Sequence, residues 1–424
     1  MKVDFIINET PKEETTKPRL GGLWRNADFL KLWTGQTISE LGSRITRDGL
    51  PMTAVLVLGA APAQMGFMTA VGAACTLIFG LIAGVWVDRM KRRPILIAAD
   101  LARAAVLLSI PIAALAHRLT MTQLYATVAL TGFCTVFFDV AYRSYLPALV
   151  GTENLLEGNS KLAMSGAIAE IAGPSLTGVL VQLITAPIAI LFDAVSFLFS
   201  ALSVGLIRKP EPEHEPTVTP PHPIEGLRFV FHHPILRPIA GFSITLFFFF
   251  GLIGPLYVLY ALRELHLDAA RLGFVIAVGG IGAMIGSTLA PVISRRLGIG
   301  RTLFWSTLGT AAGSALIPLA HGPLPMAVSF LVVQQLLGDM SLTVLFVNEL
   351  TLRQSVTPPD VLGRVNAAMQ LATRGVFPIG ALVCGVVTGF VGVRATLAIA
   401  VSGIFLGSIW LLAPSLRRLR TIPK

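Results

Sequence analysis

Four ionisable residues stand at helical spacing in the first long apolar segment of the chain, near Leu32–Leu58. They are Glu40, Arg44, Arg47 and Asp48. Positions separated by three, four, seven and eight share one face of a helix. An ionised side chain inside a bilayer costs ~2.5 to 3.5 kcal/mol on insertion scales. This face is therefore expected to meet a central cavity or another helix of its own bundle, not lipid.

Two kinds of chemistry suit this face, and the residues leave both open. The four charges sum to zero, so one interpretation is a structural ladder of ion pairs that holds the first helix in place. The other is a proton-coupling site, in which Glu40 or Asp48 takes up and releases a proton while Arg44 and Arg47 tune that exchange.

Later apolar segments contain further ionisable residues. These are Glu170, Asp339 and Arg374, together with two pairs at a spacing of four, Asp139 with Arg143 and Glu349 with Arg353. Asp100 and Arg103, three positions apart, are expected to form a structural pair. Asp193 is expected to hydrogen-bond locally.

The composition determines which elements must position these residues. Hydrophobic types make up 54% of the 424 residues and Asp, Glu, Lys and Arg only 13%, whereas soluble chains are ~25% charged. This excludes an ordinary soluble enzyme. A membrane-spanning helix needs ~20 apolar residues, and the hydropathy pattern predicts an all-α membrane protein with twelve transmembrane helices.

The basic residues predict how the helices are oriented. If the N-terminus is cytoplasmic, 25 of the 33 Lys and Arg residues fall in cytoplasmic loops and tails. Only Arg118, Arg263, Arg271 and Arg394 fall in outer loops. The positive-inside rule therefore predicts that both termini are cytoplasmic. The net charge of +10 is then mainly a topological signal and does not indicate a nucleic-acid partner.

A Pro-rich stretch, Arg208–Pro223, divides the spans into two halves of six. The predicted domains are a cytosolic disordered N-terminal tail (1–26), an N-terminal six-helix bundle (27–207), a cytoplasmic linker with a short amphipathic helix (208–234), a C-terminal six-helix bundle (235–412) and a cytosolic C-terminal tail (413–424). Asp139 and Arg143 in one half match Glu349 and Arg353 in the other, which favours two pseudo-symmetric repeats.

The segment GVWVDRMKRR follows the second span. It resembles the G-x-x-x-D-R-x-x-R-R signature of the major facilitator superfamily, through Gly84, Asp88, Arg89, Arg92 and Arg93. The resemblance implies the fold of that family, with two six-helix bundles that alternate access to the two sides.

Hydropathy ends the fourth span near Ala141, which puts Asp139 and Arg143 at its cytoplasmic end. There the resemblance implies a cytoplasmic gate in which Asp139 pairs with Arg89 or Arg92. Arg143, Glu349 and Arg353 are further gate candidates, and Glu170, Asp339 and Arg374 are candidates for the cavity or the transport pathway.

A second motif lies in the fifth span. Gly173, Pro174 and Gly178 resemble the helix-five motif typical of antiporters of this superfamily. Thr177 and Ala169 stand where fuller copies have glycine. The motif implies export, while a kink that serves packing alone is the alternative.

Runs such as DVAYRSYLPALV and TLRQSVTPPDVLGRVNA resemble the bacterial enterobactin-exporter-like and macrolide-efflux-like branch. That resemblance implies proton-coupled export of an amphipathic organic compound, such as a drug, a macrolide-like or a siderophore-like molecule, across the bacterial inner membrane. The expected partners are the lipid bilayer, the substrate and protons, with no nucleic acid, and the chain is expected to be a monomer. Two alternatives are an importer or facilitator of a small metabolite and a non-transporting receptor or assembly subunit.

The seventh span, near Ile239–Leu262, has no charge but several aromatic residues. If it faces the cavity, one wall is titratable and the other aromatic, which suits an amphipathic or cationic organic molecule. The alternative is that these aromatics face lipid. The sequence contains no P-loop, catalytic-serine or zinc-protease motif, and its three cysteines have no metal or disulfide spacing, so neither an enzyme nor a cofactor or metal site is expected.

Overall fold

The computed structural model describes residues 22–87, 89–211, 223–417 and 419. Every regular element in these ranges is helical. Most of the predicted N-terminal tail, the Pro-rich part of the linker, most of the C-terminal tail and Asp88 of the signature lie outside the described residues.

Six long helices form the N-terminal bundle. They are α1 (Ala27–Leu56), α2 (Pro62–Val87), α3 (Arg92–Leu115), α4 (Met121–Val150), α5 (Leu155–Ile184) and α6 (Ala186–Gly205), with the short turns η1 (Gly22–Arg25) and η2 (Thr152–Asn154). The side chain of Asn26 caps α1 by accepting hydrogen bonds from the N–H groups of Asp28 and Phe29. Thr120 caps α4 in the same way.

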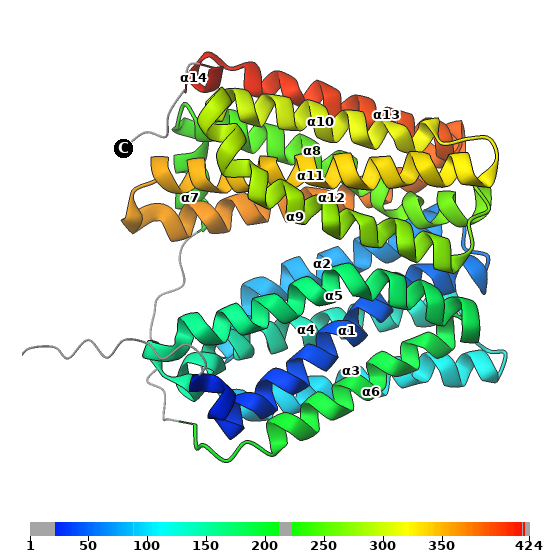
Figure 1. Cartoon of the computed structure of the whole chain (residues 1–424), viewed down its shortest axis with the longest axis vertical. Coiled ribbons are helices and arrows are strands. Elements are labelled where there is room, and N and C mark those ends of the chain that lie inside the picture. The colour runs from blue at the N-terminus through cyan, green and yellow to red at the C-terminus, as the bar shows by residue number, and fades with distance from the viewer. Residues whose placement is uncertain (1–21, 88, 212–222, 418, 420–424) are drawn as a thin grey trace, which may run out of the picture.

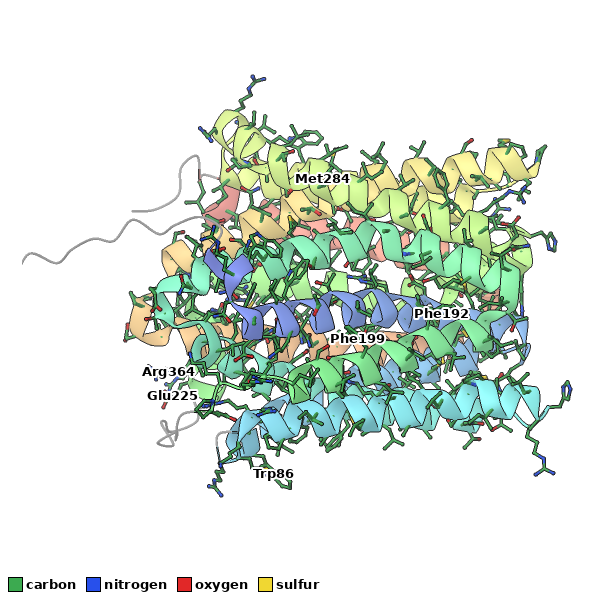
Figure 2. All side chains as sticks on the ribbon, turned by 60° about the horizontal axis from the view of Figure 1, so that its bottom comes forward. Trp86, Phe192, Phe199, Glu225, Met284 and Arg364 are labelled. Atoms are coloured by element: carbon green, nitrogen blue, oxygen red, sulfur yellow. The ribbon has the colours of Figure 1, made fainter. Side chains whose placement is uncertain are left out.

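The C-terminal bundle repeats this plan after one additional short helix. Its elements are α7 (Pro223–His232), α8 (Leu236–Leu259) with η3 (Tyr260–Glu264), α9 (Ala269–Leu297), α10 (Ile299–Leu319), α11 (Leu324–Val356), α12 (Pro359–Val391), α13 (Val393–Gly407) with η4 (Ser408–Leu412), and α14 (Pro414–Arg417). Helix α7 corresponds to the amphipathic helix expected in the linker. It packs on α12, where Glu225 forms an ion pair with Arg364 (Figure 2).

The pseudo-symmetry of the two halves is visible at their tightest turns. Thr185 alone separates α5 from α6, and Gly392 alone separates α12 from α13. Both have a left-handed backbone, with φ of +83° and +81°. The turn geometry is therefore the same in both halves, although a β-branched residue adopts it in one and glycine in the other.

Ten of the described helices are long and apolar enough to cross a membrane. Helices α1 and α10 complete the two sets of six: α1 packs against α5 and α6, and α10 against α11 and α13. Figure 2 shows large apolar side chains on the outer surface, and Trp86 and Met284 are 60% and 55% exposed. A surface of this kind is suited to lipid. The predicted fold of twelve transmembrane helices in two bundles is confirmed.

Figure 1 shows the two bundles side by side, with the start of α1 and the short helices α7 and α14 on one side of the molecule. We call that side the linker end and the other the opposite end. One continuous hydrophobic core crosses between the bundles at the opposite end and joins Met52 and Met65 to Leu256 and Cys384. A separate hydrophobic core, which contains Phe29, fills the linker end of the N-terminal bundle.

The bundles touch mainly through α2 against α12 and α5 against α9. Near the opposite end Gly66 of α2 lies against the carbonyl of Ala381, and a Cβ built on Gly385 would be 2.6 Å from Ala63 Cα. Gly84 lies five helical turns from Gly66 on the same face of α2, yet a Cβ there would meet nothing within 4 Å. The bundles therefore meet at the opposite end and separate towards the linker end.

Candidate functional site

The charged face of α1 turns inward and contacts α5. Arg44 forms an ion pair with Glu170, and Arg47 Nη2 donates to Glu170 Oε1 at 3.1 Å. The side chain of Glu170 is 49% exposed, whereas that of Arg44 is 13% exposed. The two arginines and Glu170 thus connect α1 to α5, and Arg44 is the most buried of the three.

Glu40 lies apart from this contact, in a cavity inside the N-terminal bundle. The cavity has a volume of about 270 Å³ and is lined by α1, α3, α4 and α5. Asp139, Arg103 and Tyr142 share it with Glu40. Arg103 pairs with Asp100 and stacks on the rings of Phe138 and Phe197, 4.4 and 4.0 Å from their centroids.

The sequence predicted that Asp139 lies at a helix end, and this prediction is wrong. Hydropathy placed the end of the fourth span near Ala141, but α4 continues to Val150. Asp139 therefore lies eleven residues, or ~16 Å, inside that end. The pair with Arg89 or Arg92 that the resemblance implied is absent among the described residues: Arg89 is exposed and Arg92 has another partner.

That partner is Glu211, at the start of the linker. Arg92 Nη1 lies 3.4 Å from Glu211 Oε1, and the carboxylate also accepts from the backbone N–H groups of Arg92 and Arg93, at 2.9 to 3.2 Å. Arg93 donates to the carbonyls of Val204 and Gly205 at the end of α6. Glu211 therefore caps α3, whose N-cap residue, Lys91, makes no side-chain capping bond.

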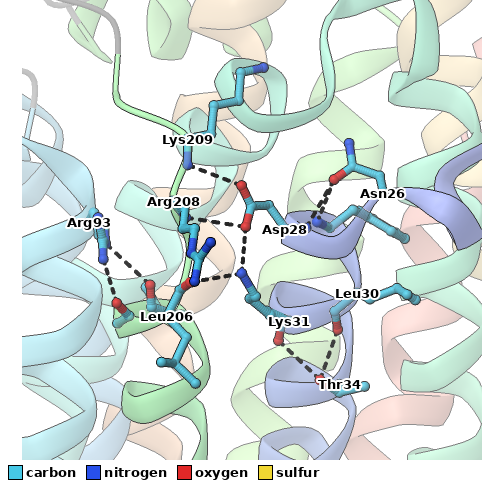
Figure 3. Close-up of polar contacts among 12 residues, drawn as sticks. Asn26, Asp28, Leu30, Lys31, Thr34, Arg93, Leu206, Arg208 and Lys209 are labelled. Carbon is cyan, nitrogen blue, oxygen red and sulfur yellow. Dashed lines mark hydrogen bonds and ion pairs between the residues drawn. The ribbon is translucent and has the colours of Figure 1, made fainter.

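Asp28 anchors the same stretch of chain to α1 (Figure 3). Its carboxylate accepts from Lys31 Nζ at 2.8 Å and from the backbone N–H groups of Arg208 and Lys209 at 3.2 and 3.0 Å. The hydrogen bond from Lys31 is the main cause that lowers the pKa of Asp28 below its usual value. The start of the linker is thus bound to the N-terminal bundle through two carboxylates, those of Asp28 and Glu211.

The other gate candidates lie in different surroundings. Glu349 and Arg353 of α11 form an ion pair at 3.6 Å, and both are largely buried. Arg143 of α4, which corresponds to Arg353 in the other half, is exposed and forms no ion pair within the described part of the chain. Arg374 is exposed on α12 and forms no ion pair within the described residues.

Asp48 and Asp339 line a second cavity, which we call the interface cavity. Its volume is about 320 Å³, and apart from Asp48 of α1 its lining comes from α8, α9, α10 and α11 of the C-terminal bundle. Tyr257 donates to Gln334 at 3.2 Å, and Gln334 donates to Gln335 at 3.2 Å. The carboxylate of Asp339 occupies the space that a Cβ on Gly279 would need.

The aromatic residues expected in the seventh span have three different environments. Phe250 and Tyr257 line the interface cavity. Tyr260 is buried and donates to the carbonyl of Ala320 at 3.0 Å, whereas Phe247 stacks on Phe346. Only part of this helix therefore forms an aromatic wall.

The two glycines of the helix-five motif face different neighbours of α5. A Cβ on Gly173 would be 2.6 Å from Arg44 Cβ, so this glycine makes room for the stem of Arg44. Gly178 faces the other bundle, where a Cβ would be 3.0 Å from Gly273 Cα and closer still to the carbonyl of Ala269. The carbonyl of Pro174 packs on the same Gly273.

Within the described ranges no group of three or more His, Cys, Asp or Glu side chains is placed to hold a metal ion. Cys75, Cys134 and Cys384 are free thiols. The chemistry that this arrangement offers is therefore that of carboxylates, arginines and neutral hydrogen-bonding groups inside two cavities.

A model of the Major Facilitator Superfamily matches residues 32–381. The chain belongs to this superfamily. Enterobactin exporter EntS of Escherichia coli O1:K1 / APEC is 27% identical over 324 residues, which cover 72% of this chain and 75% of EntS. Multidrug efflux pump Tap of Mycolicibacterium fortuitum is 24% identical over 357 residues, 81% of this chain and 85% of Tap. The protein is thus a multi-pass membrane transporter.

Solved structures share the fold at lower identity. A bacterial homologue of the iron transporter ferroportin, in an inward-facing state, gives a TM-score of 0.71 at 18% identity and covers 91% of this chain and 98% of its own. In an outward-facing state the score is 0.55 over the same shares of the two chains. The nucleoside transporter NupG gives 0.74 at 12% identity, over 92% and 99% of the two chains.

Proposed function

We propose that this transporter exports an amphipathic organic compound in exchange for protons, by alternating access. The observation that supports this most is the placing of four carboxylates, those of Glu40, Asp139, Asp48 and Asp339, on two cavities inside the bundles. Asp48 and Asp339 are partly buried, and protonation removes most of the cost of holding such a carboxylate away from bulk water. A change in water access to either cavity therefore changes how strongly its carboxylates hold protons.

The arrangement of the bundles supports alternating access. They are packed together at the opposite end and separated towards the linker end, which corresponds to one of the two states that such a cycle requires. With the linker end in the cytoplasm, as the basic residues predict, this state is open to the inside. The higher TM-score with the inward-facing ferroportin homologue, 0.71 against 0.55, is consistent with that assignment.

The direction of transport is inferred from relatives and from the motif in α5. EntS and Tap are named as an exporter and an efflux pump. Gly178 and Pro174 lie where α5 packs against α9 of the other bundle, so they belong to a contact that must change when the bundles reorient. We place the protein in a bacterial inner membrane with both termini in the cytoplasm. We also propose that it is a monomer, with bundles at 27–207 and 235–412.

A drug-resistance and dye-efflux panel in a pump-deficient bacterial host tests the proposal. Cells that express the protein are expected to hold less lipophilic dye than cells with empty vector, and an uncoupler should remove the difference. A gain of intracellular solute would instead identify an importer or facilitator. No change for any compound, with the protein present in the membrane, would favour a receptor or assembly subunit.

A further inference from the structure

The two cavities differ in how their acidic residues are balanced. In the cavity of the N-terminal bundle, Glu40 and Asp139 face Arg103. The interface cavity is lined by Asp48 and Asp339 and by no Lys, Arg or His side chain of the described chain. It is therefore the more negative of the two whenever its carboxylates are ionised.

Neither carboxylate of the interface cavity has a partner among the described residues. Asp48 Oδ2 is buried and receives no hydrogen bond. Arg47, which precedes Asp48 in α1, instead bonds to Glu170 at 3.1 Å. Asp339 also lines the cavity and forms no hydrogen bond or ion pair within the described residues. A buried charge without a partner is unfavourable, so such a site has a strong preference for a ligand of opposite charge.

Neutral groups in the cavity also have unused hydrogen-bonding capacity. Ser314 is only 5% exposed and makes no side-chain hydrogen bond within the described residues. Gln335 is 8% exposed, and its amide bonds to Gln334 at one end only. Both side chains line the cavity and are available to a polar ligand.

The remaining walls determine what kind of cation fits. Phe250 and Tyr257 contribute aromatic surface, and Ile253, Ile276 and Leu342 contribute aliphatic surface. Aromatic faces attract alkylammonium groups, and an apolar lining favours an organic body over a hydrated metal ion. A volume of about 320 Å³ lies at the lower end of the range for small-molecule sites.

We propose that the interface cavity is the binding site for an organic cation, which Asp48 and Asp339 hold by charge and Tyr257 and Phe250 hold by their rings. The inference rests on the proposed transport function and gives the substrate its class, a protonated amine or a quaternary onium. Asp48 belongs to one bundle and the rest of the site to the other. Reorientation of the bundles separates the two carboxylates and so lowers affinity in the other state, as release requires.

Equilibrium binding to the purified full-length protein tests this site. The probe is radiolabelled tetraphenylphosphonium, and the competitor is tetraphenylborate, an anion of the same shape. The wild type is expected to bind the cation and to ignore the anion. Asp339→Asn and Asp48→Asn should each weaken cation binding at least tenfold, because each removes one of two charges from a water-poor site.

Three further variants distinguish a binding role from a folding defect. Asp339→Glu keeps the charge and should bind more tightly than Asp339→Asn. Gly279→Ala should weaken binding, because its methyl group displaces the carboxylate of Asp339. Glu264→Gln removes an exposed acid at the opposite end and should leave binding unchanged. All variants should elute as single species and unfold cooperatively on heating, as the wild type does.

Three outcomes would overturn the inference. The first is that both asparagine variants bind the cation as tightly as the wild type. The second is competition by tetraphenylborate, and the third is displacement of the probe by a divalent metal ion at equal concentration. The inference and the transport proposal can fail separately. Binding with the expected dependence in a protein that expels no compound would contradict export, and uncoupler-sensitive export without this dependence would contradict the cation site.

Discussion

Gly178→Ala is expected to weaken the closed contact between the bundles at the opposite end. The added methyl group would be 3.0 Å from Gly273 Cα and 3.1 Å from Ala270 Cα, and nearer still to the carbonyl of Ala269. All three are backbone atoms of α9, which cannot turn aside as the end of a side chain can. The two helices must therefore move apart in this state.

The magnitude follows from the cost of overpacking. An extra methylene in a close-packed contact costs ~1 to 3 kcal/mol. If separation of the bundles at the opposite end relieves this cost, the equilibrium between the two states shifts ~5- to 150-fold. A state populated at ~1% then rises to between ~5% and ~60%.

Spin labels across the opposite end measure that shift. One label replaces Arg118 in the α3–α4 turn, and the other replaces His321 in the α10–α11 turn; both positions are exposed. The native thiols, Cys75, Cys134 and Cys384, are first replaced by serine. Double electron–electron resonance should show one short distance for the parent protein and an additional longer one for Gly178→Ala.

Gly166→Ala is the matched control, since it changes the same helix where a Cβ meets nothing within 4 Å. It should give the parent distribution. Gly273→Ala places a methyl group on the other side of the same contact and should reproduce the longer distance, which covers the case in which Gly178→Ala does not fold. A folded Gly178→Ala protein with the parent distribution would refute the reasoning.

Three further predictions concern the anchors of the chain. Lys31 lowers the pKa of Asp28, so the stabilisation by the Asp28 carboxylate is complete above ~pH 4 and is lost as the pH falls through the lowered folded-state pKa. In thermal unfolding scans from pH 7 to 3, Asp28→Asn should lack this loss of stability in acid, and a pH profile equal to that of the wild type would disprove it. Glu211→Ala removes the cap on α3 and the partner of Arg92, and should lower the free energy of unfolding by ~1 to 3 kcal/mol, with a double-mutant cycle detecting the coupling. Arg103→Lys keeps the charge but loses planar stacking on Phe138 and Phe197, and should cost ~0.5 to 2 kcal/mol; a thermal midpoint equal to that of the wild type would contradict it.

The fold was predictable because lipid imposes strict requirements on sequence. Each span must be long and apolar, and loops on the two sides differ in basic residues. Helix α1 shows the limit of hydropathy, because its charges exclude it from the ten helices that qualify by length and composition. Its assignment depended on the repeat of six and on the family resemblance.

The errors in the site have physical causes. Hydropathy marks where the bilayer ends but not where a helix ends, so Asp139 was placed at the gate although α4 continues for nine residues beyond Ala141. The role of Glu211 was missed because its contact with Arg92 joins residues 119 positions apart. Nothing in a Pro-rich stretch distinguishes that carboxylate from its neighbours.

The polar lining of the two cavities could be predicted only in part. The acids attracted attention because a charge in an apolar run is unfavourable. Ser314, Gln334 and Gln335 are neutral and give no such signal, so their position depends on how α10 and α11 are rotated about their axes. Arg103 was recognised as the partner of Asp100, but its place on the cavity of the N-terminal bundle required the packing of α3 against α4.

Transport by purified protein in liposomes is the most direct test of proton-coupled export. A lipophilic dye of fixed charge is added outside liposomes that have an acidic lumen. Because its charge is fixed, the dye cannot be trapped inside by protonation. The account predicts that the dye accumulates only in liposomes that contain the protein, and that a protonophore abolishes the accumulation. Accumulation of the same rate and extent with and without the pH gradient would contradict it.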